Sequence, residues 1–300
     1  MSASNVCANA SCPKGDSSTT NLLLCSRCRK ARYCSQDCQA ASWPSHKQDC
    51  RRQNYIIKVQ LFPGKITDPE VVRTISCPAE ASFWDLHVVL QLAFGWTGTH
   101  AYDFAVMDPD FRVSADPLQD LLRMTASGPP RITADMPREY ELRLVDPTFP
   151  PNRRAIDRMH EWQRKHPRMV EKQADQWALW KVFDSAKYRG KQVIYMYDFG
   201  DKWEHYLTVE GRADVTDRFV CLSGTGHPVA EDVGSVNGWK ELKEAYRTSR
   251  PSQEQRDRRK WYENMASNGD PEGLAGDRIN FWDMERVNRH LKIIFPNVHV

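Results

Sequence analysis

Eight residues near the amino end of this chain are of the types that bind soft divalent metal ions. Seven are cysteines and one is a histidine, and their spacing is C-x4-C-x12-C-x2-C-x5-C-x3-C-x7-H-x3-C. Eight ligands divide into two tetrahedral sets of four, which is the closed coordination of structural rather than catalytic zinc. The sequence therefore predicts two Zn²⁺ ions, held by Cys7, Cys12, Cys25, Cys28, Cys34, Cys38, His46 and Cys50.

Composition favours metal binding over disulfide formation for these thiols. The 300-residue chain has no run of about 20 apolar residues, which a membrane helix needs, and its first residues lack the basic-then-apolar profile of a secretion signal. We therefore expect a cytoplasmic or nuclear protein without a membrane partner. In such a reducing compartment, clustered cysteines are more often metal ligands than disulfides.

The segment from Cys7 to Cys50 cannot fold by burying apolar surface alone. Its only run of large aliphatic residues is Leu22 to Leu24. Structural zinc contributes roughly 10–16 kcal/mol in finger peptides, which makes up for that lack of core. The excess of basic over acidic side chains in the segment is three, and seven thiolates with two Zn²⁺ offset it. A near-neutral finger argues against strong binding to nucleic-acid phosphates.

The ligand pairs suit short local structures. Cys25 and Cys28 bracket a two-residue knuckle, and Cys34 with Cys38 lie one helical turn apart, as do His46 and Cys50. Each pair supplies half of a site, but the spacing leaves open which pairs share an ion.

Residues around the later ligands resemble the MYND finger. The matching positions are Tyr33-Cys34-Ser35, Cys38-Gln39, Trp43, His46-Lys47 and Cys50. The resemblance covers every ligand position, although the first spacing, C-x4-C, is slightly longer than the commonest form. It implies an interleaved arrangement in which one ion takes the first and third ligand pairs (Cys7, Cys12, Cys34, Cys38) and the other takes the second and fourth (Cys25, Cys28, His46, Cys50).

The same resemblance implies a role in protein recognition. MYND fingers typically bind proline-containing peptides of the PxLxP kind, and the positions that match their groove are Ser26, Gln39 and Trp43. An indole offers a flat apolar surface to proline, while an amide and a hydroxyl can bond to peptide backbone. The alternative for Trp43 is that it packs against the small core of the finger itself.

A second domain, expected over residues 55–295, should fold by a hydrophobic core and belong to the α+β class, because strands and helices mix without regular alternation. Strands are predicted over 55–62 and 70–77, on either side of the turn-forming Pro63-Gly64-Lys65, and further strands over 102–107, 140–145, 192–197 and 203–210. Helices are predicted from Ser82, with Asp85 in a capping box, to Gly95, and over 117–124, 238–248, 253–265, 282–291 and two segments within 153–182.

Several phrases of this second domain resemble the uncharacterised family named after open reading frame three of the Ri plasmid. The matching residues are Leu86-His87, Phe94-Gly95-Trp96, His100, Tyr197 to Asp201, Trp203-Glu204-His205, Glu231 to Gly234, Gly238-Trp239 and Leu242. The chain departs from the family pattern at Ser235, where a second glycine is usual, and in the long charged stretch 147–182.

The second domain also contains side chains suited to a metal or acid–base site, namely His87, His100, Asp198, Asp201 and His205. Sequence spacing does not show that they meet. The alternative is structural, with both aspartates capping turns through backbone amides and His87 at the polar edge of a core helix. We expect structural roles and no enzymatic activity, and an enzyme using this His/Asp group remains a further hypothesis.

A nucleic-acid-binding alternative rests on residues 153–191. This stretch has eleven basic and five acidic residues, with Trp162, Trp177 and Trp180 interleaved. Basic side chains beside aromatic rings can meet phosphates and stack on bases. The same pattern also fits a solvated helix face with its tryptophans turned inward. The hypothesis we favour is an intracellular adaptor whose zinc finger binds a protein partner through a proline-containing peptide.

Overall fold

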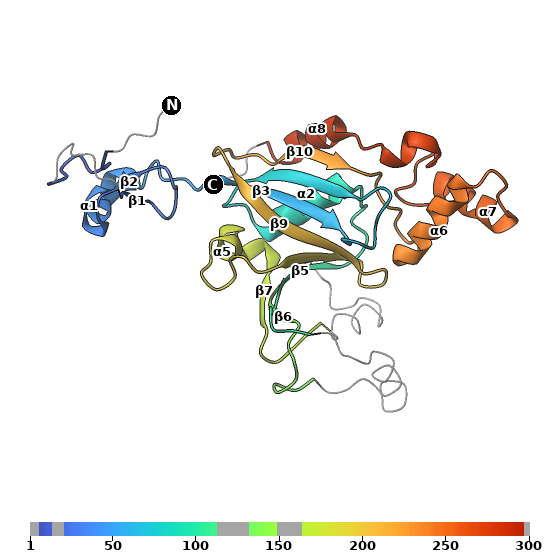
Figure 1. Cartoon of the computed structure of the whole chain (residues 1–300), viewed down its shortest axis with the longest axis horizontal. Coiled ribbons are helices and arrows are strands. Elements are labelled where there is room, and N and C mark those ends of the chain that lie inside the picture. The colour runs from blue at the N-terminus through green and yellow to red at the C-terminus, as the bar shows by residue number, and fades with distance from the viewer. Residues whose placement is uncertain (1–5, 14–20, 113–131, 149–163, 297–300) are drawn as a thin grey trace.

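The computed structural model describes residues 6–13, 21–112, 132–148 and 164–296. A small cysteine-rich finger precedes a larger domain of sheet and helices (Figure 1). In the finger, β1 (Leu23–Leu24) pairs antiparallel with β2 (Arg32–Tyr33), and α1 (Gln36–His46) follows. The predicted α+β class is confirmed.

The larger domain is built on an eight-stranded sheet. In spatial order its strands are β10 (Val220–Thr225), β4 (Val72–Cys77), β3 (Asn54–Leu61), β9 (Trp203–Ala213), β8 (Val193–Tyr197), β5 (Tyr102–Met107), β6 (Tyr140–Val145) and β7 (Val170–Gln173). Neighbouring strands are antiparallel except β6 and β7, which run parallel. In β3, Tyr55, Ile57, Val59 and Leu61 are fully buried and alternate with less buried residues, so one face of this strand belongs to the core.

Helix α2 (Phe83–Phe94) packs against this core. Ser82 and Asp85 form the predicted capping box, in which each side chain accepts the other residue's backbone N–H. Leu86, Leu90 and Phe94 are buried on the core side of the helix. The helix ends at Gly95, whose φ of 75° is left-handed and where a Cβ atom would lie 2.9 Å from Pro228. A larger residue at this position would disturb the end of the helix.

Further helices complete the domain (Figure 1). They are the short η1 (Ala174–Gln176) and α5 (Trp180–Phe183), then α6 (Ser235–Arg247), α7 (Gln253–Asn264), η2 (Gly276–Asn280) and α8 (Met284–Ile294). Helix α8 is fixed to β10 through Asn288, whose side-chain amide bonds both the N–H and the C=O of Cys221 at 2.9 Å. Within the described part of the chain, no helix has the length and apolarity needed to cross a bilayer.

Outside residues 153–182, the predicted strands and helices lie within a few residues of the observed ones where the structure describes them, but two strands were not predicted. Strand β10 has two exposed apolar residues, Val220 and Leu222, and β7 has an exposed charged sequence, so neither shows a clear buried alternation. The predicted helix over 117–124 lies outside the described residues. For the two helices predicted within 153–182, the described part instead contains β7, η1 and the start of the short α5.

Charged side chains join the finger to the larger domain. Glu80 accepts a hydrogen bond of 2.7 Å from Arg52 in the connecting segment and lies 3.7 Å from Arg27 of the finger. The guanidinium of Arg52 also stacks over Trp180 at 4.0 Å from the ring centroid. The segment between the two parts therefore contacts the larger domain through Arg52, and Glu80 also lies near the finger.

Two histidines of the larger domain, the buried His205 and the partly buried His87, are neutral. Trp96 donates a hydrogen bond of 3.1 Å to Nε2 of His205, which leaves Nδ1–H to donate to the carbonyl of Trp203 at 3.0 Å. His87 lies 2.8 Å from the hydroxyl of Tyr195. Burial lowers the pKa of each histidine to about 3, because the charged imidazolium would lose its hydration.

We predict that acid destabilises the larger domain between about pH 6.5, the ordinary histidine pKa, and pH 3. In that range the unfolded chain binds protons that folded His87 and His205 do not. The free energy of unfolding should therefore fall by about 1.4 kcal/mol per pH unit for each histidine. Urea unfolding followed by tryptophan fluorescence between about pH 6.5 and pH 5 measures this slope. His205→Gln should remove about half of it, and an unchanged slope in the variant would contradict the assignment.

Candidate metal centre

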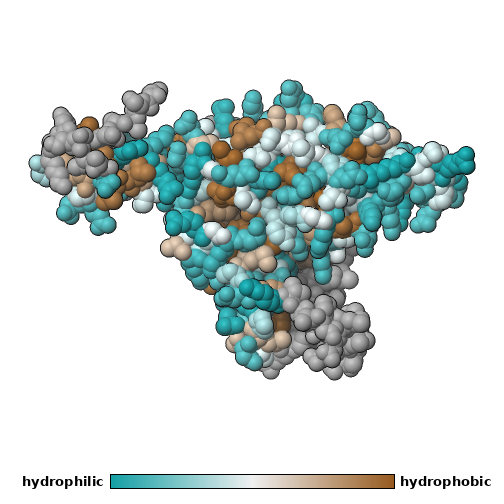
Figure 2. All heavy atoms as spheres, viewed as in Figure 1, coloured by the Kyte–Doolittle hydropathy of each residue, from teal (hydrophilic) through white to brown (hydrophobic). Residues whose placement is uncertain are grey.

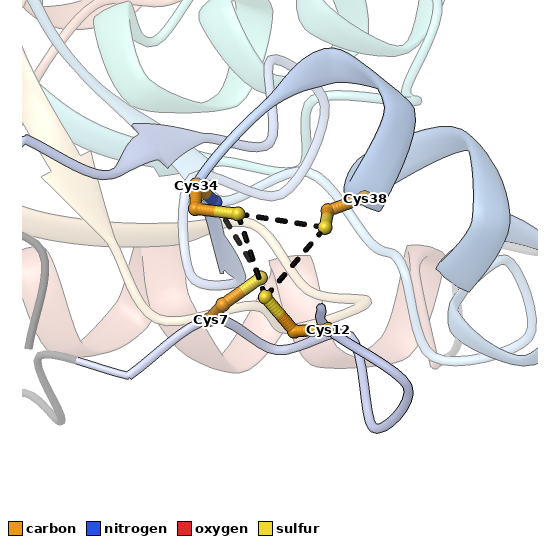
Figure 3. A group of neighbouring side chains, drawn as sticks. All are labelled: Cys7, Cys12, Cys34 and Cys38. Atoms are coloured by element: carbon orange, nitrogen blue, oxygen red, sulfur yellow. Dashed lines mark hydrogen bonds between the residues drawn. The ribbon is translucent and has the colours of Figure 1, made fainter. Parts of the chain in front are cut away.

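The first group of ligands joins the amino-terminal segment to the start of α1. Cys7, Cys12, Cys34 and Cys38 point toward one another, as Figure 3 shows. The sulfur of Cys34 lies 3.5 Å from that of Cys12 and 3.4 Å from that of Cys38, and Cys12 and Cys38 are 3.8 Å apart. Ser35 caps α1 by accepting the N–H of Cys38 at 3.2 Å, which places Cys38 in the first turn.

The second group of ligands joins the knuckle at Cys25 and Cys28 to the end of α1 and the residues after it. The sulfurs of Cys25 and Cys50 are 3.7 Å apart, and Nε2 of His46 lies 3.5 Å from the sulfur of Cys28. In each group, the four ligand atoms all lie within 4.8 Å of one another. The structure therefore has the interleaved pairing that the family resemblance implies.

These separations fit tetrahedral zinc. With Zn–S bonds of about 2.3 Å and Zn–N bonds of about 2.0 Å, a regular tetrahedron places two sulfurs about 3.8 Å apart and a nitrogen about 3.5 Å from a sulfur. The observed distances range from 3.4 to 3.8 Å, and all the cysteines are free thiols. Two Zn²⁺ ions, one for each group, are thus the cofactors of this finger.

Without metal, the thiols of one group would not all ionise together. Burial raises the pKa of Cys25, but hydrogen bonds, that from the backbone of Cys28 foremost, lower it further, to about 7. Burial and the hydrogen bond with Cys25 raise the pKa of Cys50 to about 12. A divalent cation between them stabilises both as thiolates. Zinc therefore supplies the charge that this cluster requires.

Little apart from metal holds the finger together. Its buried cluster consists of four of its cysteines and one large side chain, Tyr33, whose ring lies edge-on to His46 at a centroid distance of 6.0 Å. The two ions compensate for the missing core by tying four segments to one another.

The three predicted peptide-binding residues flank the ligands. Ser26 follows Cys25 and is exposed, while Gln39 and Trp43 lie one turn apart on α1 and so face the same side. The ring of Trp43 is 39% exposed and stands edge-on to His46 at 6.0 Å. Trp43 thus packs partly against the finger and leaves part of its indole accessible.

Of the candidate residues in the larger domain, only two come together. His100 and Asp198 lie 3.6 Å apart, whereas His87 and His205 are separate parts of the core. Asp198 accepts the backbone N–H of Gly200 at 2.8 Å, as turn-capping residues do. Asp201 instead accepts the backbone N–H of Gly234, 33 residues further along the chain, at 3.1 Å.

A third residue, Asp232, reaches the same place as His100 and Asp198, and sequence reasoning did not single it out as a site residue. Its signal was its position in the Glu231 to Gly234 phrase that resembles the second family. Ser235, which stands where that family has glycine, keeps a left-handed φ of 63°. Glycine adopts this left-handed conformation more easily than serine does.

The basic stretch 153–191 is described only from residue 164. There, Trp177 and Trp180 pack against the core, and Arg164 forms an ion pair of 2.7 Å with buried Asp103. Lys191 pairs with Glu141 at 2.8 Å. These contacts engage side chains that the nucleic-acid hypothesis would require to be free, and Trp162 lies outside the described residues.

We predict that Cys34→Ala unfolds the finger, because an alanine leaves the first zinc site with three ligands and the segment with almost no core. The variant should contain at most one zinc ion per chain by elemental analysis, and protease should cleave it within residues 7–50. Cys77→Ala, which removes a buried thiol of the larger domain, serves as the control and should retain both ions. A Cys34→Ala protein with two zinc ions and full protease resistance would contradict the assignment.

Two proteins and one solved structure are similar to parts of the chain. An uncharacterized protein, y4hQ of Sinorhizobium fredii, is 28% identical over 180 residues, which are 59% of this chain and 66% of that protein. The MYND-type zinc finger protein samB of Emericella nidulans is 46% identical over 44 residues, 15% of this chain and 8% of samB. A crystal structure of a protein of unknown function from Methanosarcina mazei Go1 matches 78% of this chain and 97% of its own, with 19% identity and a TM-score of 0.48.

Family models match both parts of the chain. The MYND finger model matches residues 7–50, which contain all eight zinc ligands. The model described as plasmid pRiA4b ORF-3-like protein matches residues 53–290, including the sheet and most of the helices. This chain is thus a member of the plasmid pRiA4b ORF-3-like family that carries an amino-terminal MYND finger.

Proposed function

We propose that this protein is an adaptor whose finger binds a proline-containing peptide of a partner protein. The observation that carries the proposal is the half-exposed indole of Trp43, held on α1 by zinc ligands at both ends of the helix. A rigid aromatic face presented to solvent is the usual recognition element for proline rings. Gln39, on the same side of α1, offers an amide that can bond to peptide backbone.

A second feature of the finger supports peptide binding. Leu23 and Leu24 of β1 are 49% and 47% exposed, although they are apolar. Strand β1 pairs with β2, and among the described residues no other strand borders it. A peptide in extended conformation can add to such an edge through main-chain hydrogen bonds and cover the two leucines.

The finger's zinc sites favour recognition over catalysis. Each ion has four protein ligands, so neither site leaves a position for a reactive water. The zinc ions therefore act by holding the peptide-binding residues in place.

A cavity of about 530 Å³ between finger and larger domain suggests where the bound peptide continues. Ser26 and Arg27 line it from the finger, and Trp177, Trp180 and Lys181 line it from the larger domain. Its wall carries three basic residues, Arg27, Arg52 and Lys181, and one acidic residue, Asp184. Arg52 is paired with Glu80, so Arg27 and Lys181 contribute most of the positive charge. We therefore expect acidic residues beside the proline motif to strengthen binding.

We predict that Trp43→Ala weakens binding of a labelled PxLxP peptide by about thirtyfold, the effect of losing a central aromatic contact. Gln39→Ala should weaken it by about fivefold through the loss of one hydrogen bond. Fluorescence anisotropy measures both, and zinc content should be unchanged because neither side chain is a ligand.

The matched control for Trp43 is Trp84→Ala, since Trp84 lies in the larger domain with a similar exposure of 38%. A peptide with alanine in place of both prolines controls for non-specific binding. The proposal fails if the wild-type protein does not distinguish the two peptides, or if Trp43→Ala and Gln39→Ala bind as tightly as wild type.

A further inference from the structure

Three side chains from three separate segments of the larger domain converge at one place. His100 precedes β5, Asp198 follows β8, and Asp232 lies in the loop before α6. His100 Nδ1 is 3.6 Å from the carboxylate of Asp198, and its Nε2 is 3.4 Å from that of Asp232. One potential ligand atom from each residue lies within 4.8 Å of the other two.

Contacts within the group do not satisfy these side chains. Both distances exceed those of an ordinary hydrogen bond, about 2.7–3.2 Å. Nε2 of His100 is buried and has no hydrogen-bond partner in the structure. Asp198 is only 11% exposed at its side chain. Two carboxylates thus face one imidazole in a partly dehydrated place.

No fixed cation balances the two carboxylates. Within the described ranges, neither Asp198 nor Asp232 forms an ion pair with a lysine or arginine. The arrangement therefore combines an unpartnered nitrogen donor with two oxygen donors and a deficit of positive charge, which a divalent cation would correct.

The backbone around the group is tied together by one buried carboxylate. Glu231, next to Asp232, accepts hydrogen bonds from the Tyr197 hydroxyl at 2.6 Å, from the Thr97 N–H at 2.9 Å and from the Thr97 hydroxyl. Tyr197 adjoins Asp198, and Thr97 lies in the segment that leads to His100. Glu231 therefore fixes the three segments that carry the candidate ligands.

Backbone contacts fasten the same segments further. The N–H of Asp198 donates to the carbonyl of Ala101 at 2.9 Å, next to His100. The hydroxyl of Ser235 donates to the carbonyl of Asp201 at 2.7 Å, which joins the loop of Asp232 to the turn of Asp198. The approach of the three side chains is consequently a property of the fold.

We propose that His100, Asp198 and Asp232 form a third metal site, which binds a divalent ion of the Mn²⁺ type. One imidazole and two carboxylates are the mixed nitrogen and oxygen ligands that such ions accept, and the absence of thiolate distinguishes this site from the two in the finger. Ligands of one octahedral ion lie about 3 Å apart when adjacent and about 4 Å apart when opposite. One ion binds only one of the two ring nitrogens of His100, and one ligand atom from each of the three residues lies within 4.8 Å of the other two. The side chain of Asp232, which is 65% exposed, must therefore move toward the other two ligands to complete the site.

The test is a Mn²⁺ titration of the zinc-loaded full-length protein, followed by the electron paramagnetic resonance signal of free Mn²⁺. The thiolate sites of the finger do not compete, because thiolates prefer zinc. We expect one Mn²⁺ per wild-type chain and a loss of affinity of at least about tenfold in Asp198→Asn and in Asp232→Asn. Asparagine suits both positions, since each has a left-handed φ of 56° and an amide oxygen can still accept the Gly200 N–H.

The control variant is Asp257→Asn, which removes a carboxylate of α7 that lines a surface hollow together with Asp232. It should bind Mn²⁺ as wild type does, which separates a specific site from general attraction by acidic residues. Thermal unfolding shows whether each variant is folded. If Asp198→Asn does not fold, Asp232→Asn provides the test, because Asp232 is exposed. Absence of bound Mn²⁺ in wild type, or equal affinity in folded Asp232→Asn, overturns the proposal.

Discussion

Zinc–ligand bonds are the constraint on which the finger depends. Tyr33 is the one large buried side chain of its core cluster, so apolar burial cannot specify the arrangement of the chain there. Each ion instead joins an early ligand pair to a later one. The position of α1, and with it the exposure of Trp43, follows from these crosslinks. A peptide-binding face on so small a unit is therefore only as stable as its metal sites.

The larger domain achieves its order by different means. Its sheet and helices enclose an extensive aromatic core, and its buried charges are held by hydrogen bonds. Arg73, fully buried, donates to the carbonyls of Ala93 and Gly226 and lies between the rings of Phe94 and Trp282. Figure 2 shows hydrophilic residues over much of the visible surface of this domain, with apolar residues among them. Such a scaffold can support a polar group like that at Glu231 without metal, whereas the finger cannot.

The zinc ligands could be predicted because their chemistry is local. A two-residue knuckle, or a spacing of one helical turn, brings the two ligands of a pair together whatever the rest of the fold is. Helix α2 was predictable for the same reason, since Ser82, Asp85 and Gly95 carry its boundaries. The interleaved pairing of ligands could not be derived from spacing, and only the family resemblance supplied it.

The meeting of His100, Asp198 and Asp232 could not be predicted from the sequence. His100, Asp198 and Asp232 are far apart in the chain and meet only because strand order brings their loops together. The sequence hypothesis grouped His205 with His100 and Asp198. However, Trp203, His205 and Leu207 are all buried and alternate along β9, which indicates a core position for His205. The alternation of residues along β9 would have separated His205, in the core, from the residues of the loops. No local sequence pattern identifies Asp232.

Two zinc ions, held by seven thiolates and one imidazole, maintain the finger and present Trp43. Native mass spectrometry of the reduced, full-length protein, before and after the cysteines react with an organomercurial reagent, tests this dependence on metal. We expect two zinc ions that are released as the thiols react, accompanied by a gain of protease cleavage within residues 7–50. A chain that holds no thiol-dependent zinc, with residues 7–50 still compact, would contradict the account.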